Sequence, residues 1–174
     1  MKIELGGGDR NRGEGFTNVD TNPCADIIHN LETFPYPFDD ESVAEVYSSH
    51  CLEHLADPHA VLRELCRICT LNAAIEIRVP HYNNPLQFTA GHKHCFSTLQ
   101  AEDMDQDFAH LTWHGPKRLK LVRYELHPTR FLHQARKELP FLHGVTDQVV
   151  MKYIAGTCHE TRFFYTVVQN EHYS

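Results

Sequence analysis

Two short segments of the sequence carry the residue types from which binding sites are built. The first contains three consecutive glycines, Gly6, Gly7 and Gly8, and is followed later by Asp20. Glycine adopts positive φ freely and lets a ligand approach the backbone, while a carboxylate accepts hydrogen bonds from hydroxyl groups. Nucleotide-binding α/β folds hold a ribose with such a glycine turn and acid. The first segment therefore predicts a small-molecule cradle, with a glycine-rich hairpin and an exposed aspartate as the alternative.

The second segment contains the polar cluster His50, Glu53 and His54. Spacings of three and four residues place these side chains on one face of a helical turn, where His81 could join them. Histidine and carboxylate are ligands of metal ions, and the histidines would favour zinc or iron over magnesium. A metal site is thus one open interpretation of this cluster.

Histidine also suits proton removal at neutral pH. His50 and His81 each follow an expected strand, at the edge of a parallel sheet where ligands bind. We therefore predict that His50 and His81 are the catalytic residues. The alternative is that His50 only packs beside a ligand and that His81 only caps a loop.

The elements that would position these residues follow from the hydrophobic pattern. Strands are expected where apolar residues alternate or where β-forming residues cluster: 2–5, 16–19, 25–31, 43–47, 74–79, 119–126 and 162–168. Asp57 and Pro58 predict the start of a helix that ends near Thr70. A second helix is expected over 98–104, and one or two more over 128–155. This order of strands and crossovers predicts an α/β fold with a mostly parallel sheet.

Composition limits the classes of function. The 174 residues are 41% hydrophobic and 22% charged, which predicts one globular domain over 1–174. The net charge of −7 disfavours nucleic acid and membrane surfaces as partners, and no segment is apolar enough to span a bilayer. Six cysteines without a leader peptide predict reduced thiols and a cytoplasmic location. Cys66 and Cys69 form a CxxC within the expected helix and are interpreted as packing residues.

Six short motifs, in order, resemble the class I S-adenosylmethionine-dependent methyltransferases, and most of all the small bacterial type 11 group. They are Leu5-Gly6-Gly7-Gly8, Asp20, Asn30-Leu31, Tyr36 to Val43, Leu52-Glu53-His54 and Arg78-Val79-Pro80. The resemblance implies a Rossmann-like, mostly parallel seven-stranded sheet with an antiparallel last strand. It also implies S-adenosylmethionine as cofactor and a small-molecule substrate, a small or glycan-like metabolite methylated on oxygen or nitrogen.

The resemblance further implies roles for individual residues. Leu5, Gly6, Gly7 and Gly8 would face the methionyl part of the cofactor, and Asp20 the ribose hydroxyls. Asn30 and Leu31 would lie at the adenine edge, and Ser49 and His50 on the methionyl side. Because the Leu-Glu-His triplet is common in metal-free relatives, no metal ligand is assigned.

The sequence also departs from the family pattern. Arg10 replaces a third glycine, and residues 9–15 leave room only for a loop, so the helix between the first two strands is missing. Cofactor binding is therefore expected to be weak, and two alternatives stay open: a catalytically reduced cofactor-binding domain and a histidine-rich metal-binding protein. Segments 83–116 and 128–156 are the candidate cover of the acceptor site. Nothing in the sequence indicates the oligomeric state.

Overall fold

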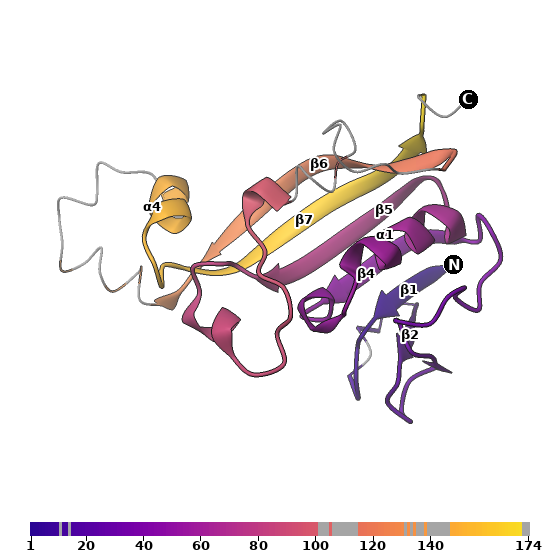
Figure 1. Ribbon diagram of the computed structural model, residues 1–174, viewed down its shortest axis with the longest axis horizontal. Coiled ribbons are helices and arrows are strands. Elements are labelled where there is room, and N and C mark those ends of the chain that lie inside the picture. The colour runs from indigo at the N-terminus through magenta and orange to yellow at the C-terminus, as the bar shows by residue number, and fades with distance from the viewer. Residues whose placement is uncertain are drawn as a thin grey trace.

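The chain forms a single seven-stranded sheet in the order β3-β2-β1-β4-β5-β7-β6 (Figure 1). The computed structural model describes residues 1–10, 12–13, 15–100, 105, 115–130, 132, 134, 138 and 147–171. The strands are β1 (Lys2–Leu5), β2 (Phe16–Asp20), β3 (Ile27–Ile28), β4 (Val43–Ser49), β5 (Cys69–Pro80), β6 (Lys117–Pro128) and β7 (Cys158–Gln169). The helices of the described residues include η1 (Leu52–His54), α1 (Pro58–Ile68), η2 (Pro85–Phe88) and α4 (Asp147–Tyr153).

Strand directions confirm the predicted fold class. β1, β2, β3, β4 and β5 pair in parallel, and β7 is antiparallel to both β5 and β6. The carboxyl ends of the parallel strands therefore meet at one edge of the sheet, which is where ligands bind in open α/β sheets. In the connection from β1 to β2, the described residues 6–10, 12–13 and 15 form turns and extended chain without a helix, as predicted.

The strand bounds differ most from the predicted ones at β3 and β5. β3 contains only Ile27 and Ile28, instead of 25–31, and Ile28 is 65% exposed because β3 is the edge strand. β5 begins at Cys69, directly after α1, and its pairing with β4 is interrupted by a bulge. Asn72 lies in this bulge at φ 65°, a conformation that asparagine tolerates better than most residues.

Helix α1 covers one face of the central strands (Figure 1). The Asp57 side chain accepts a hydrogen bond from Ala60 N, and Pro58 occupies the first turn, so the predicted start is confirmed. The buried face of α1 packs with apolar side chains of the sheet in one core, including Val61, Leu62, Leu65, Ile3, Leu5, Val46, Ile75 and Ile77. Cys66 and Cys69 are both buried in this core, in agreement with their interpretation as packing residues.

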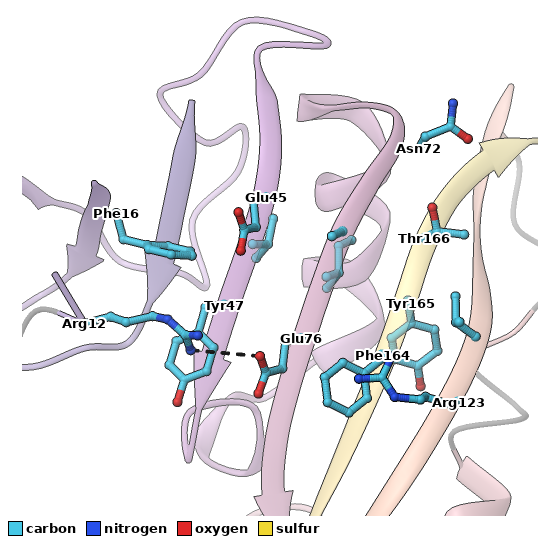
Figure 2. A pocket seen from close by; sticks show the side chains of 14 residues that line it. Arg12, Phe16, Glu45, Tyr47, Asn72, Glu76, Arg123, Phe164, Tyr165 and Thr166 are labelled. Carbon is cyan, nitrogen blue, oxygen red and sulfur yellow. Dashed lines mark ion pairs between the residues drawn. The ribbon is translucent and has the colours of Figure 1, made fainter. Parts of the chain in front are cut away.

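The opposite face of the sheet carries a mixture of charged and aromatic side chains, shown in Figure 2. Arg12 lies with its guanidinium carbon 3.8 Å from the centre of the Tyr47 ring, and Arg123 lies 3.7 Å from the centre of the Phe164 ring. These residues border a hollow of about 280 Å³ over the strands. Stacked arginines therefore cover aromatic rings on a face where the described residues place no helix.

The helices of the described residues are all too short or too polar to cross a membrane. The predicted helix over 98–104 is helical at residues 98–100, and its remaining residues lie outside the described part of the chain. Within 128–155, α4 is one of the predicted helices, while 139–146 lie outside the description.

The contribution of the stacked arginines on the face opposite α1 can be tested by measuring the free energy of unfolding. We expect Arg12→Ala to lower the free energy of unfolding by about 1 kcal/mol, because a stacked guanidinium contributes roughly this much at a partly exposed site. The measurement is urea denaturation at neutral pH. Arg10→Ala is the matched control from the same loop, since the Arg10 side chain is 93% exposed. Equal effects of the two substitutions would show that stacking of Arg12 contributes nothing.

Candidate functional site

The glycine run and Asp20 meet at the carboxyl edge of the sheet. Gly7 N donates a hydrogen bond to Asn18 Oδ1 at 3.1 Å, and Gly8 N donates to Asp20 Oδ2 at 2.9 Å. Gly6 and Gly8 adopt φ angles of 73° and 60°. The glycine turn thus folds back over the end of β2 and fixes the Asp20 carboxylate.

Close packing explains why two of these positions are glycine. A Cβ atom at Gly6 would lie 2.6 Å from Cys51 Cβ, and one at Gly7 would lie 2.6 Å from Asn18 Oδ1. Neither separation is compatible with van der Waals contact. Any side chain at Gly6 would therefore displace Cys51 or the turn itself.

A hollow of about 180 Å³ opens beside this turn. It is lined by Gly6, Asp20, Thr21, His29, Asn30, Leu31, Cys51 and Leu55. Four of these residues, Gly6, Asp20, Asn30 and Leu31, were predicted from the sequence to hold a cofactor. Its volume is below the roughly 300–1,000 Å³ of sites that enclose a drug-sized ligand, so it can enclose only part of a nucleoside cofactor.

The hollow combines a carboxylate with apolar walls. Asp20 Oδ1 accepts from Asn22 N at 2.8 Å and from Thr21 Oγ1 at 3.4 Å, whereas Oδ2, which accepts from Gly8 N, keeps a second lone pair for a ligand. The Leu31 backbone is fixed by Tyr36, whose Oη donates a hydrogen bond to the Leu31 carbonyl at 2.9 Å. Burial raises the pKa of the Cys51 thiol to about 12, so Cys51 is a neutral wall residue. This combination suits a sugar diol with an attached apolar ring.

The other predicted cofactor residues lie next to the hollow without lining it. Leu5 is buried at the end of β1, and Gly7 and Gly8 form the outer part of the turn. Ser49 ends β4, in register with Arg78 of β5. Their predicted cofactor roles stay predictions.

His50 follows β4 at φ 52° and lies between two carboxylates. His50 Nε2 is 3.0 Å from Glu160 Oε2, and His50 Nδ1 is 3.4 Å from Glu53 Oε1. The hydrogen bond with Glu160, followed by the interaction with Glu53, raises the pKa of His50 to about 9. His50 is therefore an imidazolium at neutral pH, which cannot accept a proton.

His81 follows β5 and is fully buried. Its Nδ1 accepts a hydrogen bond from Asn83 N at 3.4 Å, and burial lowers its pKa, so the ring is neutral. A fully buried ring cannot touch a substrate in this conformation. The catalytic roles predicted for His50 and His81 stay predictions, and the structure does not bring the two rings into one pocket of the described residues.

Sequence reasoning missed half of the residues that line the hollow. Thr21 follows Asp20, His29 lies within the predicted strand 25–31, and Cys51 and Leu55 bracket the Leu52-Glu53-His54 turn. The last two could have been found from their spacing of four residues, which places both on one side of a helical turn.

Another hollow, of about 520 Å³, lies beyond the carboxyl end of β5. Its lining combines mostly apolar surface with a few hydroxyl, amide and ammonium groups: Tyr82, Cys95, Ser97, Thr98, Leu99, Gln100 and Lys152. Most of these residues belong to segment 83–116, and Lys152 belongs to segment 128–156. Lys152 Nζ is held 2.7 Å from Tyr124 Oη, which fixes one wall.

Comparison with known proteins shows which fold the chain shares and which family model part of it matches. Residues 14–75 match the family model of a methyltransferase domain. A solved S-adenosylmethionine-dependent methyltransferase from Archaeoglobus fulgidus superposes with a TM-score of 0.60 at 11% identity, covering 95% of this chain and 85% of that one. No curated protein sequence matches the chain.

Two further solved structures show how widely this fold is used. The putative methyltransferase in complex with the Trm112 activator of Haloferax volcanii has a TM-score of 0.57 at 17% identity, over 95% of this chain and 81% of that chain. The [4+2]-cyclase SpnF has a TM-score of 0.58 at 14% identity, over 95% and 73%. At these identities the likeness shows the fold alone. The chain has the fold of the class I S-adenosylmethionine-dependent methyltransferases, with a methyltransferase domain match over 14–75, as the resemblance implied.

The Glu160 carboxylate should make the free energy of unfolding depend on pH in the acidic range. Burial alone would raise the pKa of Glu160, but hydrogen bonds from His50 and Arg162 lower it to about 2. A carboxylate with a depressed pKa stabilises the fold above its unfolded value of about 4.3, and this contribution is lost as the pH falls toward 2. We expect Glu160→Gln to cost on the order of 2–3 kcal/mol at pH 6 and almost nothing at pH 2.

The measurement is the free energy of unfolding of wild type and Glu160→Gln at pH values between 2 and 7. Glu171→Gln is the control, because Glu171 is exposed at the end of the described chain. A constant difference between wild type and Glu160→Gln across this range would contradict the assignment.

Proposed function

We propose that the protein is an S-adenosylmethionine-dependent methyltransferase that acts on an oxygen or nitrogen atom of a small or glycan-like metabolite. The contact between the glycine turn and the Asp20 carboxylate, beside a hollow at the carboxyl edge, carries the proposal. The methyltransferase domain match over residues 14–75 supports it independently.

In this proposal, the hollow holds the adenosyl part of the cofactor. Asp20 accepts hydrogen bonds from the ribose hydroxyls, and Asn30, Leu31 and Leu55 surround the adenine ring. The backbone of the glycine turn, Gly6 to Gly8, lies where the methionyl part would follow. When bound, S-adenosylmethionine supplies a methyl group that its sulfonium has already activated for displacement.

We further propose that the 520 Å³ hollow receives the acceptor. It lies beyond β5, and its hydroxyl, amide and ammonium groups from Ser97, Gln100 and Lys152 can bind a polar metabolite. Segments 83–116 and 128–156, as the proposed cover, would position the acceptor, which is the main task of an enzyme in a displacement of this kind. Both segments extend beyond the described residues.

The two histidines enter the proposal with different tasks. His50 lies at the end of β4 as a cation held by Glu160 and Glu53, and we propose that it orders this part of the edge beside the cofactor. His81 would act as a positioning residue, since its ring accepts from Asn83 N and its carbonyl accepts from Asn84 N at the start of the cover. A base for a hydroxyl acceptor would then come from elsewhere in the cover.

A catalytically reduced binding domain is the second candidate function. It is favoured by the small volume of the cofactor hollow and by the absence of an available histidine base among His50 and His81.

Turnover separates the two candidates. The untagged protein is incubated with radiolabelled S-adenosylmethionine and a panel of sugars, amines and hydroxy acids. Methyl transfer to any acceptor supports the enzyme, whereas binding of both cofactor forms without transfer supports the binding domain.

Binding itself tests the site. We expect Asp20→Ala to weaken S-adenosylhomocysteine binding by about 1–3 kcal/mol, because the ribose hydroxyls would lose a charged acceptor. Asp20→Asn keeps an oxygen that can accept from Gly8 N and should lose less affinity with the turn intact. The measurement is isothermal titration calorimetry, with circular dichroism to confirm folding.

Asp9→Ala is the control, because Asp9 follows the same glycine turn but its side chain is 76% exposed outside the hollow. Unchanged affinity in both Asp20 variants would remove Asp20 from the site. No heat from wild type with either S-adenosylmethionine or S-adenosylhomocysteine would reject the proposal.

A further inference from the structure

One carboxylate of the edge is buried without a hydrogen bond. Glu53 lies in η1 with its side chain fully buried, and neither of its carboxylate oxygens accepts a hydrogen bond from any described residue. The nearest cation to Glu53 is His50, whose Nδ1 lies 3.4 Å from Glu53 Oε1. The other ring nitrogen of His50, Nε2, lies 3.0 Å from Glu160 Oε2. A fully buried carboxylate that accepts no hydrogen bond and has one ion pair on a single oxygen is still costly, and a second cation would stabilise it further.

Two histidine rings face this carboxylate from different segments. Ligand atoms of Glu53, His54 and His92 all lie within 4.8 Å of one another. The rings of His54 and His92 have centroids 4.7 Å apart. His54 follows Glu53 in η1, whereas His92 belongs to the loop after η2, so only the fold brings the three together.

Hydrogen bonds to the backbone fix the tautomers of both rings. His54 Nδ1 lies 3.1 Å from the carbonyl of Gly91, and His92 Nδ1 lies 3.1 Å from the carbonyl of Gln87. A carbonyl can only accept, so in each neutral ring Nδ1 carries the proton and Nε2 keeps its lone pair. Metal-binding histidines are oriented in this way, with the other ring nitrogen donating to a carbonyl.

Backbone hydrogen bonds join the loop that contains His92 to η1. The carbonyl of Glu53 accepts from Lys93 N at 2.7 Å and from His94 N at 3.3 Å. Gly91 adopts φ 101°, a conformation that a residue with a side chain rarely takes. Residues on both sides of His92 therefore hold its ring against η1.

We propose that Glu53, His54 and His92 bind a divalent transition-metal ion of the zinc or iron type, with at least one coordination position open. Two imidazoles and one carboxylate are a ligand set for such ions, and hard ions such as magnesium prefer oxygen ligands alone. Metal bonds of about 2.1 Å separate tetrahedral ligand atoms by about 3.4 Å. The ligand atoms of the cluster lie within 4.8 Å of one another, so the widest separation must close by at most about 1.4 Å. His54 is partly exposed and gives the ion a path from solvent.

This set differs from the one considered from the sequence. Glu53 and His54 belong to both sets, but His92 takes the place expected for His50 and His81. His50 uses its two ring nitrogens on Glu53 and Glu160, and His81 is buried beside Asn83. The proposal is independent of methyl transfer, although η1 also contributes to the cofactor hollow through its flanking residues Cys51 and Leu55.

The test compares two histidines of one loop. His94 is the matched control, because its Nε2 lies 3.1 Å from the carbonyl of Ala56 and is not directed to Glu53. Untagged protein is stripped with a chelator and titrated with Zn²⁺ alone, in competition with a chromophoric chelator. We expect one tight equivalent for wild type, a loss of at least about 100-fold in affinity for His92→Ala, and wild-type binding for His94→Ala.

Glu53→Gln keeps the shape of the side chain and should weaken binding to a similar extent. If this variant does not fold, His92→Ala still decides, because it truncates a side chain of a surface loop. Absence of a tight equivalent in wild type would overturn the proposal. So would equal losses in His92→Ala and His94→Ala, which would indicate nonspecific binding by a histidine-rich loop.

Discussion

The structure depends on a sheet that packs against a helix-covered apolar core on one face only. Parallel sheets are usually covered on both faces, and their strands are then apolar throughout. Here β1 and β5 alternate apolar and polar residue types instead. Ile3 and Ile75 pack with α1 in the core, while Glu4 and Glu76 face the other side, where Glu4 is buried and accepts a hydrogen bond from Arg12 N. This alternation lets 174 residues complete a seven-stranded sheet without a second layer of described helices.

The open face requires a substitute for helix packing. Arg12 and Arg123 supply it by lying across Tyr47 and Phe164, so their alkyl stems cover the rings while the charged groups stay near water (Figure 2). A helix is also missing at the proposed cofactor site. Where a helix N-terminus would normally close the pocket, the glycine turn and Asp20 form a shallow hollow of about 180 Å³.

The turn η1 links the two proposed sites. Cys51 and Leu55 face the hollow, whereas Glu53 and His54 lie in the cluster with His92. Because a single turn holds both sets, occupation of one site would restrict the motion of residues in the other. The fold by itself does not define the chemistry, since a cyclase shares it with methyltransferases.

Local patterns in the amino-acid sequence were enough to predict the approximate positions of the strands, the start of α1, the parallel sheet and the closeness of the glycine turn to Asp20. These features follow from local signals: alternation, capping by Asp57, and glycines placed between a strand and an acid. Asn30 and Leu31, which the resemblance to a family implied at the adenine edge, line the hollow, and their cofactor role stays a prediction.

The protonation and accessibility of the histidines, and the residues that surround them, depend on tertiary contacts. Glu160 lies 110 positions from His50, and its carboxylate makes His50 a cation; burial makes His81 inaccessible. His92 approaches Glu53 because the loop after η2 returns to η1 through backbone hydrogen bonds. Such contacts join residues that are distant in sequence, and no local pattern encodes the distance between them.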